Sequence, residues 1–274
     1  MWLNTGDGRK ITYRLEGSGP MLVCHPGGPG FSGAELGDLG GLSGHRTLVL
    51  LDPRATGGSD PAPDYAPDAY AADIDELRAH LSVDQIDLLG FSHGVIVAIV
   101  YAASYPDRVR RLVLASGVAA FSDDVQAETA RWIERQSAEP WLADAVAALK
   151  EEESGEIADL GALWQREAPL YFSHWDERFR PQMVAAAEGA AGAPLVAFNA
   201  DGFDVRGSLG DIRAPTLIIT GRDDFICGPA AAAELQHGIA DARTVLIDNA
   251  GHMTFVEQPD TFRTQVEAFL AGGG

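Results

Sequence analysis

The sequence predicts an α/β protein whose mostly parallel central sheet is flanked by helices, with a helical cap inserted before one of the last strands. Short apolar runs, typical of strands buried on both faces, alternate with helix-like segments over most of the chain. Between residues 119 and 207 this alternation stops, and four of the five tryptophans lie there among apolar residues at helical spacing. We therefore expect a core domain formed by residues 1–118 and 208–274 and a helical cap formed by residues 119–207.

The expected core elements follow one another in a regular order. Residues 10–15 alternate between polar and apolar side chains, as in a half-buried strand. Strands with continuous apolar runs are expected at residues 21–24, 48–51, 85–89, 109–115, 214–220 and 244–247. Helices are expected at about residues 67–81, directly after a turn at 90–94, and at about 229–239 and 259–270. Because helices separate most of these strands, the strands can lie parallel in one sheet.

The charge of the chain restricts its partners. Its formal net charge is −20, with 40 acidic residues against 20 basic ones spread along the length. Such a field repels phosphate backbones and anionic lipid, so we expect a small-molecule substrate, no nucleic acid and no membrane partner. No run of 18 apolar residues occurs and no signal peptide is visible, so a cytoplasmic location is expected. The sequence does not indicate an oligomeric state.

The two cysteines, Cys24 and Cys227, each lie at or after an apolar strand pattern. Two cysteines in a chain of this length do not form a disulfide framework, so buried free thiols are expected. The sequence contains neither C-x-x-C nor H-E-x-x-H. We therefore expect no metal and no cofactor.

The turn at residues 90–94 reads G-x-S-x-G, between an apolar strand and an apolar helix. This is the pattern of a nucleophile elbow, in which a strained turn presents a serine hydroxyl at the carboxyl edge of a sheet. Ser92 is the candidate nucleophile. The alternative is an ordinary turn in which Ser92 caps the following helix.

A serine nucleophile needs a base, and the base needs an acid to orient it. His252 is the best candidate base, because Gly251 precedes it in a loop after a predicted strand. Asp223 and Asp224 both follow the preceding strand and so reach the same edge of the sheet. Either aspartate can supply the acid on this argument.

Acyl transfer also needs donors for the oxyanion of the tetrahedral intermediate. The backbone N–H of His93, next to the nucleophile, is one expected donor. The second is expected from Gly28, in a glycine-rich loop after the strand that contains Cys24.

These motifs together resemble an α/β-hydrolase fold of the proline iminopeptidase-like branch. The family motifs HGGPG, DxRGxGxS, GxSxG, GRxD and GH correspond to residues 26–30, 52–59, 90–94, 221–224 and 251–252. The resemblance implies a Ser-His-Asp triad and favours Asp224 over Asp223 as its acid. Two residues depart from the motifs: Pro26 replaces a histidine, with His25 beside it, and Ala55 replaces a glycine.

Aminopeptidases of this branch bind the free amino group of the substrate with carboxylates of the cap. The cap offers Glu167, Asp176, Glu177, Glu188, Asp201 and Asp204, all expected to be solvated, and the run 151–153 is expected to be a solvated helix end. His174 and Trp175 lie in an apolar stretch and are weak candidates for substrate contact, with ordinary packing as the alternative.

The sequence thus predicts a serine hydrolase that forms an acyl-enzyme and cleaves a small ester or amide, with an N-terminal prolyl amide as one candidate substrate. A carboxylesterase or a lactonase is the main alternative. Residues 28–33 also read G-x-G-x-x-G, with Asp52 ending the next strand, so a nucleotide-binding oxidoreductase is a remote alternative. A binding protein without catalytic activity on the same scaffold is another.

Overall fold

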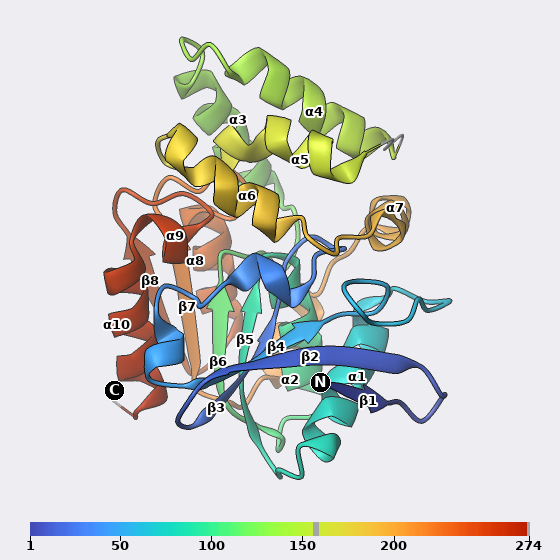
Figure 1. The fold of residues 1–274 in the computed structure, drawn as a ribbon. Coiled ribbons are helices and arrows are strands. Elements are labelled where there is room, and N and C mark those ends of the chain that lie inside the picture. The colour runs from blue at the N-terminus through green and yellow to red at the C-terminus, as the bar shows by residue number, and fades with distance from the viewer. Residues whose placement is uncertain (156–158, 273–274) are drawn as a thin grey trace.

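The computed structural model contains one eight-stranded sheet with helices on both faces and a group of helices above one of its edges (Figure 1). It describes residues 1–155 and 159–272, and the side chains of residues 199–201 also lie outside the description. The strand order is β1-β2-β4-β3-β5-β6-β7-β8. The strands are β1 (Trp2–Asn4), β2 (Lys10–Gly17), β3 (Met21–His25), β4 (Thr47–Asp52), β5 (Ile86–Phe91), β6 (Val109–Ala115), β7 (Thr216–Gly221) and β8 (Ala242–Ile247).

The sheet is mostly parallel, as the sequence predicts. Only β2 runs antiparallel to its neighbours β1 and β4, whereas β4, β3, β5, β6, β7 and β8 are parallel. Every residue of β5 and β7 is buried, which agrees with their continuous apolar sequences. The edge strand β1 was not predicted, because three residues are too few to show a period of two.

Helices cover both faces of the sheet. On one face α1 (Pro67–His80), α2 (His93–Ser104) and α8 (Pro229–Gly238) contribute to one hydrophobic cluster. On the other face α10 (Pro259–Leu270), together with the short helices η1 (Gly33–Leu36) and η2 (Leu42–Gly44), contributes to a second. A short helix, α9 (Thr254–Glu257), precedes α10. The parallel strands are therefore buried on both sides, and their carboxyl ends form a common edge.

Five helices lie above this edge in Figure 1: α3 (Asp123–Arg135), α4 (Leu142–Ser154), α5 (Leu160–Glu167), α6 (Arg180–Ala186) and α7 (Gly192–Asp201). Three short helices complete the segment, namely η3 (Ala168–Tyr171), η4 (Glu177–Phe179) and η5 (Arg206–Asp211). The N–H of Val205 donates to the carbonyl of Ala119 at 2.9 Å, so the two ends of the helical segment meet. The segment covers the site at which α/β sheets bind ligands. The division of the chain into a core domain and a cap of residues 119–207 stays a prediction.

Within the described residues, no helix combines the length and the apolar character needed to cross a bilayer. Cys24 and Cys227 are free and buried, as expected.

Candidate active site

Ser92 lies in a sharp turn between β5 and α2. Its backbone angles are φ 53° and ψ −118°, outside the regions that non-glycine residues prefer. The flanking glycines are required by close contacts: a Cβ on Gly90 would lie 2.2 Å from the carbonyl oxygen of Gly94, and a Cβ on Gly94 would lie 2.5 Å from that of His25. The G-x-S-x-G sequence therefore folds into the strained turn that presents a serine side chain at the carboxyl edge of the sheet.

Asp224 and His252 form a buried pair after β7 and β8. His252 Nδ1 lies 2.9 Å from Asp224 Oδ2, and both side chains are almost fully buried. The other carboxylate oxygen accepts the backbone N–H groups of Ile226 at 3.1 Å and Cys227 at 2.9 Å. Although burial alone raises the pKa of Asp224, the attraction of His252 and these hydrogen bonds outweigh it, so the pKa is lowered. The structure thus gives His252 a charged partner, and that partner is Asp224 rather than the half-buried Asp223.

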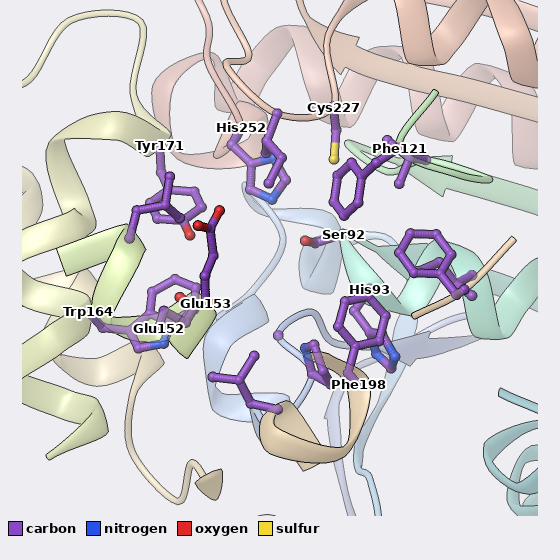
Figure 2. A pocket seen from close by; sticks show the side chains of 18 residues that line it. Ser92, His93, Phe121, Glu152, Glu153, Trp164, Tyr171, Phe198, Cys227 and His252 are labelled. Carbon is purple, nitrogen blue, oxygen red and sulfur yellow. The ribbon is translucent and has the colours of Figure 1, made fainter. Parts of the chain in front are cut away.

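The thiol of Cys227 lies beside this pair. A carboxylate oxygen of Asp224, the sulfur of Cys227 and a ring nitrogen of His252 all lie within 4.8 Å of one another. Burial, with a smaller contribution from the charge of Asp224, raises the pKa of the thiol well above its ordinary value. Cys227 therefore faces the site as a neutral group (Figure 2).

The loop that contains His252 is bound to the cap. The N–H of His252 donates to the carbonyl of Tyr171 at 2.9 Å. The carboxyl group of Glu257 accepts the N–H of Gly251 at 2.6 Å with one oxygen and the Ser173 N–H and hydroxyl at 2.9 and 2.6 Å with the other. Glu257 therefore joins the residue before His252 to the cap segment after η3. Its role was not predicted from the sequence.

Ser92 and His252 line one cavity of about 160 Å³ between the sheet edge and the cap. In Figure 2 the Ser92 hydroxyl and the His252 ring lie toward the interior of this cavity. Gly28, Pro29 and His93 line it as well. Its remaining walls are largely apolar and include Ile96, Val118, Phe121, Leu149, Leu195, Phe198, Phe203 and Ile226. The cavity is thus a small, largely apolar space next to the serine.

The two expected oxyanion donors belong to this cavity wall. His93 is the first residue of α2, and Gly28 has φ 101°, a conformation that favours glycine. A Cβ on the preceding residue, Gly27, would lie 2.8 Å from Ser92 Cβ, so the loop packs directly against the candidate nucleophile. The N–H of Gly27 itself donates to Glu35 Oε2 at 2.6 Å.

The imidazole side chains of His25 and His93 are buried next to each other and to Tyr70. Burial lowers the pKa of His25 to about 4 and that of His93 to about 3. His25 Nδ1 lies 2.8 Å from the carbonyl oxygen of Pro26. The histidine displaced from its family position is thus a neutral packing residue below the loop.

Two carboxyl groups of the cap, those of Glu152 and Glu167, are less solvated than the sequence analysis expected. Glu152 and Glu153 line the cavity, on the side opposite Ser92 (Figure 2). Glu167 is completely buried, and burial together with the neighbouring Glu152 raises its pKa to about 10. Burial also raises the pKa of Glu152. The expectation of solvation was wrong for Glu152 and Glu167, because the helices α4 and α5 pack against each other and direct these two side chains inward. Glu153 is exposed, as expected of the helix end, although it lines the cavity.

Other cap carboxylates are solvated, as expected. Glu188 is exposed, Glu177 pairs with Arg180, and Asp204 pairs with Arg206. Asp176 accepts the N–H of Arg178 at the start of η4. The side chain of Asp201 lies outside the described residues.

His174 and Trp175 do not belong to the residues that line the Ser92 cavity in the described part of the chain. They line a separate depression of about 20 Å³, together with Trp132 and Phe172. The ring of Trp175 contacts that of Phe172 at 5.4 Å. Trp175 therefore packs against a neighbouring aromatic ring, whereas His174 is exposed. Substrate contact by either residue stays a prediction.

Asp52, which the nucleotide-binding alternative assigns to a ribose, is already bound within the protein. One of its oxygens accepts the N–H of Gly33 at 3.0 Å and the other accepts the hydroxyl of Thr12 at 2.7 Å. The loop at residues 28–33 leads into the four-residue helix η1 rather than into a long α-helix. The geometry expected of a dinucleotide site is therefore not formed here.

Residues 20–259 match the family model described as alpha/beta hydrolase fold. The chain belongs to the alpha/beta hydrolase family. It is 29% identical to a proline iminopeptidase of Lactobacillus helveticus, over 96% of this chain and 95% of that protein. Among solved structures, an esterase from Exiguobacterium antarcticum has a TM-score of 0.79 at 21% identity, covering 99% of each chain.

A second solved structure, the enol-lactonase from Burkholderia xenovorans, has a TM-score of 0.77 at 23% identity, covering 99% of this chain and all of that one. These two likenesses concern the fold alone. Membership of the family, with proline iminopeptidases among the relatives, identifies this alpha/beta hydrolase as a hydrolytic enzyme.

Proposed function

We propose that the protein is a serine hydrolase that removes an N-terminal residue, with proline preferred, from a small amide or short peptide. The observation that carries the proposal is the pairing of His252 with Asp224 beside Ser92, in a cavity whose opposite wall bears Glu153. The relatives named as proline iminopeptidases support it.

In the proposed mechanism, Ser92 attacks the scissile carbonyl while neutral His252 takes the hydroxyl proton. Asp224 stabilises the imidazolium that forms. The backbone N–H groups of Gly28 and His93 bind the oxyanion of the tetrahedral intermediate. His252 then gives the proton to the leaving amine, and water releases the acyl group from Ser92 by the same route in reverse.

Recognition of an amine is supported by the carboxyl groups of the cap wall. A protonated amino group in a largely apolar cavity needs an opposite charge within reach. Glu153 lines the cavity directly, and Glu152 lies next to it. Glu167 behind them is a buried acid whose ionisation is opposed by burial and by Glu152. A substrate ammonium would favour the charged forms of these groups, so the cap would select substrates with a free amino terminus.

The cavity size supports a small acyl group. Sites for drug-sized ligands usually enclose about 300–1,000 Å³. The present cavity is smaller, at about 160 Å³. A single small residue on the acyl side, with the leaving group toward the opening, fits these dimensions better than a long chain.

An esterase or lactonase is the second candidate function, and the apolar walls of the cavity favour it. Side chains such as Val118, Phe121 and Phe198 offer no hydrogen bonds to an amide leaving group. The esterase and the enol-lactonase with the same fold show that this scaffold serves such reactions. In this case Glu153 would have no substrate amine to bind.

The test compares prolyl 2-naphthylamide, its N-acetyl derivative and p-nitrophenyl acetate, with wild type, Ser92→Ala, Glu153→Gln and Glu188→Gln. We expect Ser92→Ala to lose all turnover and N-acetylation to abolish cleavage of the amide. Glu153→Gln should raise KM for prolyl naphthylamide about 2- to 5-fold and leave ester cleavage unchanged, because an ion pair with an exposed carboxylate contributes up to about 1 kcal/mol.

Glu188 is the matched control, since it is a cap carboxylate that is exposed and away from the cavity lining. Glu188→Gln should behave as wild type. Equal cleavage of the free and the acetylated amide would contradict amine recognition. Serine-dependent cleavage of the ester alone would favour the second candidate, and full activity of Ser92→Ala would refute both.

A further inference from the structure

Glu35 is a buried acid to which the proposed reaction assigns no role. It lies in η1, only 5% of its surface is exposed, and Oε2 accepts the N–H of Gly27 at 2.6 Å. Gly27 directly precedes Gly28, the proposed oxyanion donor. Glu35 therefore holds the backbone of the loop that carries this donor.

The carboxyl group of Glu35 also lies close to the nucleophile. The point where a Gly27 Cβ would stand is 2.8 Å from Ser92 Cβ and 3.1 Å from Glu35 Oε2. That oxygen and Ser92 Cβ are therefore at most about 6 Å apart, a separation at which two like charges in a buried site repel strongly. A charge on Glu35 would act on the oxyanion that forms at this place.

Within residues 1–155 and 159–272, no salt bridge includes Glu35, and its pKa is raised by burial to about 8, with only the Gly27 N–H opposing the rise. The titratable groups on the neighbouring elements are Asp52 of β4, Tyr171 of η3 and Arg180 of α6. Across the cavity lie His93, Glu152, Glu153, Cys227 and His252, with Glu167 next to Glu152.

Few of these surrounding groups can ionise in the same alkaline range. Burial raises the pKa of Tyr171 and of Cys227 well above their ordinary values, and the charge of Glu35 contributes to the shift of Tyr171. The hydrogen bond from Arg180 to Glu177, together with the negative charge of Glu177, raises the pKa of Arg180. Arg180 therefore stays charged in this range. Burial also raises the pKa of Glu152 and, together with Glu152, raises that of Glu167 to about 10. An alkaline change in activity is therefore assigned to Glu35 by comparing wild type with Glu35→Gln, and not by its pH range alone.

We propose that Glu35 is a positioning residue that works in its neutral form, holding Gly27 so that Gly28 faces the oxyanion, and that its ionisation suppresses acyl transfer. At about 6 Å and an effective dielectric constant of about 20, a charge on Glu35 would slow formation of the oxyanion about 100-fold. The inference rests on the proposed roles of Ser92 and Gly28.

The experiment measures kcat and KM from pH 6 to 10 for wild type, Glu35→Gln and Glu35→Ala, with a substrate whose cleavage is lost in Ser92→Ala. For wild type we expect kcat/KM to decline above about pH 8, as Glu35 ionises. Glu35→Gln keeps a neutral acceptor for the Gly27 N–H, so it should retain activity at pH 7 and lose the alkaline decline. Glu35→Ala leaves that N–H unpaired and should lower kcat 10-fold or more, with a smaller change in KM.

Asp87→Asn is the matched control, because Asp87 is also buried with a raised pKa but lies at the start of β5, away from Ser92. It should keep the wild-type decline. The inference is overturned if Glu35→Gln retains the decline, if it is as impaired as Glu35→Ala, or if Asp87→Asn removes the decline as well. Activity that survives Ser92→Ala would overturn the proposed function and this inference together, whereas a retained decline in Glu35→Gln overturns this inference alone.

Discussion

Replacing Asp224 by asparagine tests the charge that the structure places behind His252. The two side chains are buried with 2.9 Å between Nδ1 and Oδ2. At this distance and an effective dielectric constant of about 20, a carboxylate and an imidazolium attract by roughly 6 kcal/mol. Because about 1.4 kcal/mol corresponds to a tenfold change in rate, Asp224→Asn should lower kcat/KM by about 10³- to 10⁴-fold.

The assay is kcat/KM at pH 7 on the best Ser92-dependent substrate, with circular dichroism to show that the fold is kept. Asp223→Asn is the matched control, since Asp223 is the adjacent aspartate and is half-buried, and its backbone N–H donates to the carbonyl of Ala250. It should change kcat/KM less than about 3-fold, because a half-exposed carboxylate has little effect at this range. An equal loss in the two variants, or a larger one in Asp223→Asn, would refute the assignment of the acid.

Three further predictions concern stability. Ala55 has φ 69°, where an L-residue is strained by about 1–2 kcal/mol and glycine is not, so Ala55→Gly should raise the free energy of unfolding by about 0.5–1 kcal/mol in urea titrations. Glu35 stays protonated in the folded protein up to about pH 8, whereas the unfolded chain releases that proton above about pH 4.3, so wild-type stability should fall as pH rises through this window. Glu35→Gln should therefore gain about 2–4 kcal/mol relative to wild type between pH 5 and pH 8, and a pH-independent difference would contradict the buried neutral acid. Glu257→Gln should lose about 1–3 kcal/mol and lower kcat, because an amide oxygen cannot replace both carboxylate oxygens toward Gly251 and Ser173; unchanged melting and kcat would refute the link between cap and loop.

The sequence predicts the core of this fold well because its signals are local. Buried parallel strands appear as continuous apolar runs, and each run ends at a polar or glycine-rich segment. Ser92, Asp224 and His252 follow β5, β7 and β8, which are parallel and lie in one sheet. Their meeting at one edge is therefore a consequence of strand direction, which the alternation of strands and helices already indicates.

Which carboxylates of the cap are buried and which are solvated could not be predicted in this way. The run of three glutamates at 151–153 has the composition of a solvated helix end, and Glu151 is indeed exposed and paired with Arg166. Glu152 differs only in its position around α4, which places it toward α5 and Glu167. Which face of a helix is buried depends on the neighbour that docks against it, and a largely polar helix end contains no periodic apolar signal for that neighbour.

The position of Glu35 follows from the glycine-rich backbone of residues 27–30 and from one tertiary contact. The glycines of the loop at residues 27–30 allow its backbone to approach Ser92, and this approach leaves the N–H of Gly27 away from water. A buried N–H needs an acceptor, and η1 supplies a carboxyl group from eight residues further along the chain. The same contact that gives the Gly27 N–H an acceptor therefore places a titratable group close to Ser92. On the proposal made above, the conformation of this loop and the pH range of activity would both depend on the Glu35 side chain.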